Sequence, residues 1–462
     1  MKKVLAVAMM LLMSAGIAAA AEDTSWLKIG GDYQFRFDSL KGTVHEYVQN
    51  TGTLPGTPIP GHDVSNDSLM TNRFGLNLKA NALEDVSVKA RFIMYKIFGQ
   101  ETSAAADGSY AGDRAMGSND GTIGHIPQDN TLRVDYGYAT WSNIGQLPVW
   151  FSVGRRPSTG GIPSNIRNNS EKMGTAGIPS IMVDYAFDGM TLGYAPDIDK
   201  LPGAYVKLCY GRGFESGFND KYSTTGTTLK DTDFMGINAA IIDTDALHAE
   251  LQYQKGWHIF DMPSDGVASF GTTRPTQNLG DLDWIGGVVM GKVKSINWFF
   301  SAARSHTSPN DNTFMNNGQT GLLWTGTKES HSGNAIYLGG RYDIDSTGTK
   351  IGAEYNQGSK YWIGMVPAAD DVWTSKLGTR GSVYEIYIIQ ELKNKPISKD
   401  GKAFFKLGYQ YYKFDYTGSN FWVGAPVKIS DLSQDVSNPN NYQMLAPLQK
   451  ATDIYLTFEV RF

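Results

Sequence analysis

The sequence predicts a closed transmembrane β-barrel of about sixteen antiparallel strands. Three observations predict it: apolar and polar residues alternate along many segments, short turns alternate with long polar loops, and the last strand ends on Phe462. Successive side chains of a strand point to opposite faces, so each such segment has one apolar and one polar face. A membrane barrel requires this pattern, because lipid covers its exterior and water fills its lumen.

The start of the chain has the composition of an export signal. A basic start precedes an apolar run from Val4 to Leu12, and small residues then lead to a cleavage site before Glu22. The apolar run is shorter than a membrane anchor requires. We therefore expect a signal peptide over 1–21 and a single barrel over 22–462.

The first strands are expected directly after the signal peptide. Apolar and polar residues alternate from Leu27 to Asp38, about the length that a tilted membrane strand needs. A long Gly/Pro-rich loop is expected from Leu40 to Asp67. Two further strands, 73–80 and 86–92, flank a tight turn at 84–85.

Turns and loops alternate in the same way along the rest of the chain. Short turns are expected near 145–146, 197–198, 243–245, 294–295, 346–348 and 395–396. Long loops are expected at about 100–129, 155–178, 214–231, 258–280, 306–332, 359–380 and 415–450. The strands between them number about sixteen, with both termini on the short-turn side. Residues 180–196 allow one strand or a hairpin over Asp188-Gly189, and one strand keeps the next turn on the correct side.

A soluble all-β chain of sandwiches would also show alternating strands. However, structureless loops longer than about 15 residues are uncommon in soluble domains, and this chain has several. Charged residues also recur on one strand face, which suits a water-filled lumen. The barrel is therefore the preferred interpretation.

Composition excludes several functions. A net charge of −5 and a pI near 5.8 argue against nucleic acid as a partner. Cys209 is the single cysteine, so neither an internal disulfide nor a cysteine zinc cluster can form, and the chain has no haem-attachment motif.

His248 and Glu250 face the same side of one strand, but no G-x-S-x-G or metal-binding spacing accompanies them. We expect no cofactor and no enzymatic activity.

Adjacent aspartates occur in the loop at 359–380. Asp370 and Asp371 could serve as oxygen ligands for calcium, but their spacing fits no defined calcium loop. Solvated loop polarity is the preferred interpretation of this pair.

The segments 71–76, 84–91 and 188–194, together with the terminal Phe462, resemble Gram-negative outer-membrane porins, and more narrowly a poorly characterised porin-like β-barrel family. The resemblance implies the cell outer membrane, with lipid and lipopolysaccharide around the barrel, and passive diffusion of small hydrophilic solutes. It also implies insertion by the barrel-assembly machinery, which would read the last strand through Phe458, Val460 and Phe462. A homotrimer is open, since porins of this size often form one.

The same resemblance implies a constriction by the third external loop, at 155–178 here. This loop lacks the acidic Pro-Glu-Phe-Gly-Gly-Asp pattern of enterobacterial general porins, so their cation preference does not carry over. Its own charges are mainly basic, and we expect it to meet charged lumen walls. The candidate constriction and lumen residues are Arg155, Arg156, Arg167, Lys172, Arg36, Arg73, Lys79, Lys89, Arg91, Arg133, Glu250 and Glu354.

Two interpretations of these charges stay open. They form a basic constriction that favours anions, or they solvate one another as lumen walls generally do. Two other functions also stay open. A sheath for a periplasmic multihaem cytochrome would need an unconstricted lumen, and an outer-membrane hydrolase would need an activated Ser or His.

Overall fold

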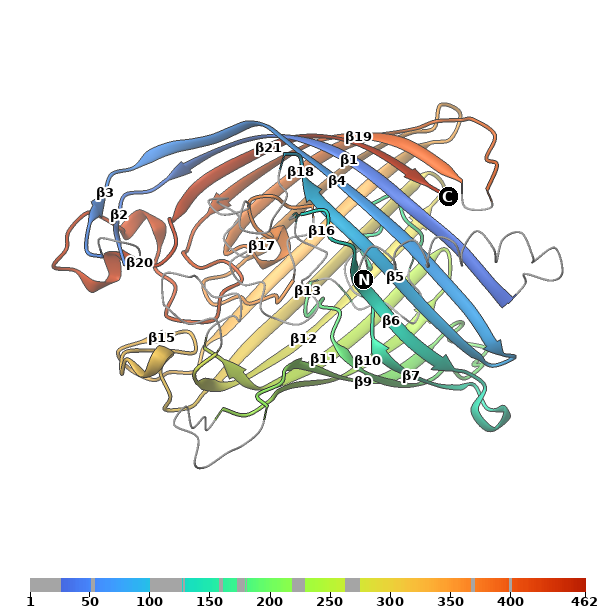
Figure 1. The fold of residues 1–462 in the computed structure, drawn as a ribbon, viewed down its shortest axis with the longest axis horizontal. Coiled ribbons are helices and arrows are strands. Elements are labelled where there is room, and N and C mark those ends of the chain that lie inside the picture. Colours follow the sequence, from blue (N-terminus) through green and yellow to red (C-terminus); the bar gives the residue numbers. More distant parts are fainter. Residues whose placement is uncertain are drawn as a thin grey trace, which may run out of the picture.

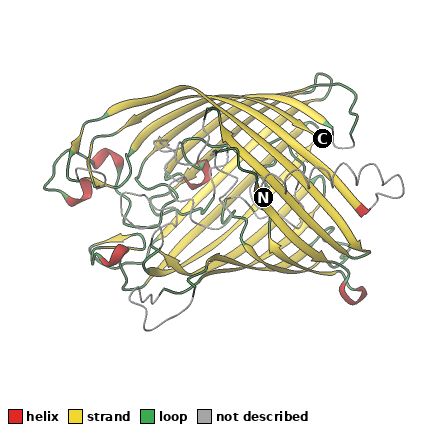
Figure 2. Ribbon diagram, viewed as in Figure 1, coloured by secondary structure: helices red, strands yellow, loops and turns green. Residues whose placement is uncertain are grey.

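The chain folds into a closed barrel of antiparallel strands in a computed structural model (Figure 1). The structure describes residues 26–50, 55–99, 127, 129–157, 161–172, 179, 181–217, 229–261, 275–366, 370–398 and 401–462. Sixteen strands form the wall, and each is paired with its neighbours in wall order (Figure 2). The expected fold class is thereby confirmed.

The wall strands are β1 (Leu27–Val44), β4 (His62–Leu83), β5 (Val86–Ile97), β6 (Arg133–Trp141), β7 (Val149–Arg155), β8 (Asp188–Tyr194), β9 (Tyr205–Phe214), β10 (Thr232–Asp243), β11 (Leu247–Phe260), β12 (Asn278–Val293), β13 (Ile296–Pro309), β16 (Ser332–Ile344), β17 (Thr349–Gly358), β18 (Gly381–Glu391), β19 (Lys402–Phe414) and β21 (Leu448–Arg461). Short strands outside the wall are β2 (Tyr47–Gln49), β3 (Pro58–Ile59), β14 (Thr320–Gly321), β15 (Trp324–Thr325) and β20 (Tyr442–Gln443). Short 3-10 helices are η4 (Ile144–Gln146), η7 (Phe314–Asn316), η8 (Lys376–Gly378), η9 (Ile429–Asp431) and η10 (Pro439–Asn441).

The barrel closes where its first and last strands meet. Phe37 of β1 lies opposite Leu456 of β21 on one side and opposite Met70 of β4 on the other. The first wall strand begins, and the last wall strand ends, at the same end of the barrel. This end carries the short turns, and we call it the periplasmic end. The opposite end, with the longer connections, is called the external end.

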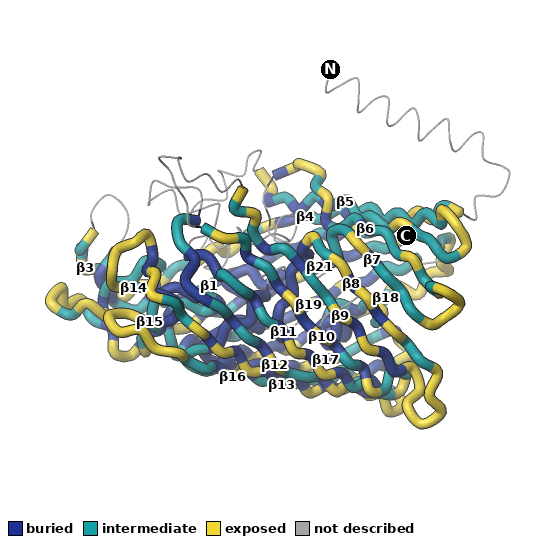
Figure 3. The backbone as a smooth tube through the Cα atoms, turned by 90° about the horizontal axis from the view of Figure 1, so that it is seen from below, coloured by how far each residue is buried: buried dark blue, intermediate teal, exposed yellow. Residues whose placement is uncertain are grey.

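Side chains alternate between the two faces of the wall, as β21 illustrates. Ile454 and Leu456 are 52% and 41% exposed on the exterior, whereas Tyr455 and Thr457 are buried on the lumen side. Figure 3 shows the same alternation of buried and exposed residues along the wall. An apolar exterior on a closed barrel is the surface that a lipid bilayer requires.

Among the described residues, no helix is both long and apolar enough to cross a membrane.

Two sequence-based boundaries are wrong. The expected loop from Leu40 to Asp67 is shorter, because β1 and β4 remain paired as far as Val44 opposite His62. The strand expected over 180–196 is single, as predicted, but it begins only at Asp188. Residues 181–187 are instead buried in the lumen, where their apolar side chains make non-strand contacts that a local pattern does not reveal.

The lumen holds an apolar cluster, which corrects the expectation of a wholly wet interior. It forms on the flank of β10 to β16, where the wall contributes Phe234, Trp284 and Tyr337. Described residues of four external connections pack into this cluster, and two of these connections carry the charges discussed below: the third, 156–187, and the seventh, 359–380. We call them loop 3 and loop 7. A buried indole joins the wall to loop 7, since Trp284 Nε1 of β12 donates to the Ile363 carbonyl at 2.7 Å.

Candidate pore interior

Loop 3 runs through the lumen as far as the periplasmic end. Lys172 Nζ donates to the Thr244 carbonyl at 3.0 Å, and Thr244 belongs to the short turn between β10 and β11. Arg461 of the last strand donates to the carbonyls of Asn168 and Asn169 at 2.7 and 2.6 Å. The loop is therefore fastened to the wall near the periplasmic mouth, far beyond the point where it leaves β7.

Loop 7 also enters the lumen, which the sequence analysis missed. Its two aspartates bind different cations: Arg73 Nη1 lies 3.0 Å from Asp370, and Arg167 Nη1 lies 2.8 Å from Asp371. The pair is buried, so the expectation of solvated loop polarity is wrong. These contacts tie loop 7 to β4 and to loop 3.

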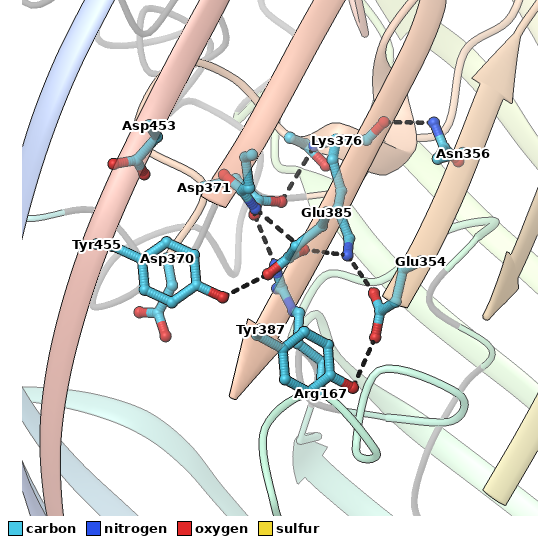
Figure 4. Close-up of polar contacts among 12 residues, drawn as sticks. Arg167, Glu354, Asn356, Asp370, Asp371, Lys376, Glu385, Tyr387, Asp453 and Tyr455 are labelled. Carbon is cyan, nitrogen blue, oxygen red and sulfur yellow. Dashed lines mark hydrogen bonds and ion pairs between the residues drawn. The ribbon is translucent and has the colours of Figure 1, made fainter. Parts of the chain in front are cut away.

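The ion pairs extend into a buried network with the wall (Figure 4). Arg167 also donates to Glu385 at 3.2 Å, and Lys376 Nζ reaches the same carboxylate at 2.7 Å. Lys376 also pairs with Glu354, which accepts a hydrogen bond from Tyr337 at 2.6 Å. Buried ion pairs lose much of their attraction to desolvation, so their main effect here is to fix where the loops lie.

Two loop charges have strongly shifted protonation equilibria. Burial alone would raise the pKa of Asp370, but the charges of Arg73, Arg36 and other nearby cations outweigh it and hold the pKa below its usual value. Burial lowers the pKa of Arg380 to about 9. Its guanidinium donates to the Trp362 carbonyl at 3.0 Å and also to carbonyls of the loop that follows β19.

Two of the predicted lumen cations form ion pairs with aspartates of the wall strands. Arg36 contacts Asp38 at 2.6 Å and Asp453 at 3.0 Å, and it is only 2% exposed. Arg91 contacts Asp32 at 2.6 Å and Asp135 at 3.1 Å. These pairs favour the interpretation in which wall charges solvate one another.

Three other predicted residues make separate contacts elsewhere in the wall. Arg133 pairs with Asp129 at 2.8 Å at the external rim, and Arg155 lies 3.6 Å from Asp188 at the last rung of β7. Glu250 faces the lumen within the wall, where Asn238 Nδ2 donates to it at 2.9 Å.

A row of lysines crosses three wall strands at the periplasmic mouth. In strand register, Lys28 of β1 lies opposite Lys79 of β4, and Lys79 lies opposite Lys89 of β5. Like charges placed opposite each other destabilise a sheet, so water or a bound ligand must offset the repulsion between these ammonium groups. Lys79 and Lys89 are predicted site residues, whereas Lys28 is not among them, although its lumen-facing parity is visible in the sequence.

This row lines a vestibule of about 850 Å³ at the same mouth. Seven basic and three acidic residues line the vestibule. The basic residues are Lys28, Lys79, Lys89, Lys350, Lys393, Lys402 and Arg461, and the acidic ones are Asp32, Glu171 and Glu391. Glu391 is itself held between Lys350 at 2.8 Å and Lys402 at 2.9 Å. The vestibule thus carries a net positive charge.

Arg156 follows β7 where loop 3 begins to turn inward. Its guanidinium lies 4.9 Å above the Tyr138 ring, which also has the Lys89 ammonium at 6.0 Å, and it donates to the Ser152 hydroxyl. Arg156 and Lys89 therefore share one side of the lumen with the lysine row.

His248 is held by two carboxylates. Its Nδ1 lies 3.0 Å from Asp243 and its Nε2 lies 3.3 Å from Glu250. Neither ring nitrogen is available to activate a nucleophile in this arrangement. Within the described ranges, no group of three or more His, Cys, Asp or Glu residues is placed to hold a metal ion.

Comparison with known proteins gives a family without an assigned function. The model "Protein of unknown function (DUF3373)" matches residues 63–462, so the chain belongs to this family. No curated protein matches the sequence.

Solved structures share the general architecture at low similarity. An anion-selective porin from Comamonas acidovorans has 10% identity and a TM-score of 0.44, covering 94% of this chain and 99% of that one. In vitro folded OmpT, an outer membrane protein of Vibrio cholerae in a trimer form, has 10% identity and a TM-score of 0.42 with the same coverage. Salmonella typhi OmpF in complex with daunomycin has 9% identity and a TM-score of 0.43, covering 94% and 97%.

Proposed function

We propose that this member of the DUF3373 family is an outer-membrane channel that passes small hydrophilic solutes by passive diffusion and prefers anions. The observation that carries the proposal is the row of Lys28, Lys79 and Lys89 in a vestibule with excess basic charge. Rings of basic side chains favour anions because they lower the electrostatic energy of a negative ion at the narrow part of its path.

The route in this proposal follows the flank of β4 to β7. Two charged lumen side chains of this flank remain partly exposed: Arg73 is 20% exposed and Arg91 is 13% exposed. The apolar cluster and the two inward loops occupy the flank of β10 to β16. Solutes are therefore confined to a narrow charged passage and not to the full bore of the barrel.

The structure gives less support to the rival functions. A cytochrome sheath requires room for a second protein, whereas loops 3 and 7 lie within this lumen and contact its walls. A hydrolase requires an available base, whereas the His248 ring is held on both sides by carboxylates.

A planar-bilayer recording with a salt gradient tests the selectivity. We expect the reversal potential of the wild type to lie toward the chloride equilibrium potential. The double substitution Lys79→Gln with Lys89→Gln removes two charges of the row and should move the potential toward zero, because fewer fixed cations then attract chloride.

The matched control removes two lysines from external loops, Lys328→Gln with Lys428→Gln, where both side chains are exposed. It should leave the potential close to that of the wild type. A wild-type potential on the cation side would refute the proposed anion preference, and a complete lack of conductance would refute the channel itself.

A further inference from the structure

A small hollow lies in the lumen wall beside the start of loop 3. It has a volume of about 60 Å³, and its lining includes Arg156, Thr191, Lys207, Gln254, Phe187 and Phe234. Lys207, Thr191 and Gln254 are 2%, 3% and 5% exposed, so a solute that enters the hollow would leave bulk water. No residue that the structure places in the lining carries a carboxylate, whereas two are cations.

The polar side of the hollow has hydrogen-bonding capacity that the described residues do not use. Arg156 Nε is buried and has no hydrogen-bond partner within the described part of the chain. An unpaired buried donor costs free energy, and a bound acceptor would recover it. The Arg156 guanidinium is also a planar donor fork that matches a carboxylate.

Another part of the lining is aromatic, and its rings already pack against one another. The rings of Phe187 and Phe234 are stacked with centroids 4.7 Å apart, and Tyr185 lies 5.8 Å from Phe187. A side chain at Gly211 would approach Phe187 Cβ to 2.8 Å, so this aromatic wall also fills the space beside β9. A preformed apolar wall needs little rearrangement to receive the hydrocarbon part of a ligand.

Charge, polarity and size together define the class of ligand. A water molecule needs about 10–15 Å³ on this scale, so the hollow holds about four to six non-hydrogen atoms. An inorganic anion would leave the aromatic wall uncovered, and a neutral solute would leave Arg156 without a counter-charge. We propose that this hollow is a binding subsite for a short-chain monocarboxylate of the size of propionate or butyrate, with its carboxylate toward Arg156 and its alkyl chain toward Phe187 and Phe234.

This inference names a solute class for the channel, and in that respect it rests on the proposed function. Its test measures binding directly and needs no conductance. The full chain, folded in detergent, is dialysed to equilibrium against radiolabelled butyrate. We expect saturable binding that unlabelled butyrate abolishes. Butanamide and inorganic phosphate should compete at least about tenfold less well, because butanamide lacks the negative charge and phosphate lacks the alkyl chain.

The substitution Arg156→Gln should weaken butyrate binding by at least about tenfold, since a charged hydrogen bond is lost. The control Arg304→Gln removes an exposed arginine that contacts Ser332 at the outer surface, and it should bind butyrate as the wild type does. The proposal is overturned if butyrate does not bind saturably, if phosphate or butanamide competes equally well, or if Arg156→Gln binds normally. The competition series uses the wild type alone, so it remains decisive even when the variant misfolds.

The two proposals can fail separately. Butyrate binding by a barrel that conducts no ions would refute the channel but leave the subsite intact. An anion-selective channel that shows no saturable butyrate binding would refute the subsite alone.

Discussion

Asp370 and Asp371 are neighbours in sequence but fasten loop 7 in two directions. Asp370 contacts Arg73 of the wall, and Gln34 Nε2 also donates to it at 3.2 Å. Asp371 contacts Arg167 of loop 3 and accepts a hydrogen bond from Gln410 at 2.9 Å. Because each carboxylate has both a cation and an amide partner, the two together determine the depth at which loop 7 lies in the lumen.

Removing the Asp370 charge should therefore destabilise the barrel measurably. In Asp370→Asn, the half-buried Arg73 keeps its charge but loses its carboxylate, and we expect the free energy of unfolding to fall by about 1–3 kcal/mol. Urea titration of tryptophan fluorescence in lipid vesicles measures this change. The exposed Asp199→Asn is the control and should unfold as the wild type does. Equal stability of the two variants would show that the Arg73–Asp370 contact contributes nothing.

The terminal strand shows how one element closes the whole wall. The Phe462 carbonyl accepts from the Gly31 amide at 2.7 Å, and the Phe462 amide donates back to Gly31 at 2.9 Å. The Phe462 ring covers Gly31 so closely that a Cβ there would lie 2.7 Å from Cζ. The Gly75 carbonyl of β4 would lie even closer, at 2.6 Å, so the neighbouring backbone and the aromatic ring together require glycine at this position.

Deletion of Phe462 should reduce the amount of folded barrel in the outer membrane several-fold. The deletion removes both backbone hydrogen bonds to Gly31 and the aromatic end of the last strand, through which we propose that the assembly machinery recognises the chain. The heat-modifiable fraction on an unboiled gel measures folded barrel in isolated membranes. Phe462→Tyr keeps the ring and the backbone and should assemble normally. Normal assembly of the deletion variant would remove Phe462 from the proposed recognition signal.

The sequence predicts the wall well and the lumen poorly, for a physical reason. Strand facing is local, because alternation along β21 alone places Tyr455 inside and Leu456 outside. The inward folding of loop 7 depends instead on partners far away in sequence, such as Arg73 and Arg167 for its two aspartates. Trp362 offered a usable signal, since a large aromatic residue in an external loop suggests burial, and it is fully buried here.

At the scale of the whole molecule, the two flanks of the lumen differ in character. The flank of β10 to β16 is covered by an apolar cluster, whereas the flank of β1 and β4 to β6 carries half-buried charges and the lysine row. A barrel of sixteen strands is wide enough for an aqueous channel, so in the channel that we propose the inward loops and not the wall set the size of the passage. The homotrimer stays a prediction.

The most direct test of this account is the single-channel conductance of a barrel whose loop 7 is shortened. Replacing residues 361–379 with a short Gly/Ser linker removes Asp370, Asp371 and Lys376 together with the buried Trp362. Provided that the heat-modifiable folded form is retained, we expect the conductance in the same salt to rise several-fold, because the passage widens toward the full bore. A folded barrel with unchanged conductance would contradict the account that inward loops narrow this channel.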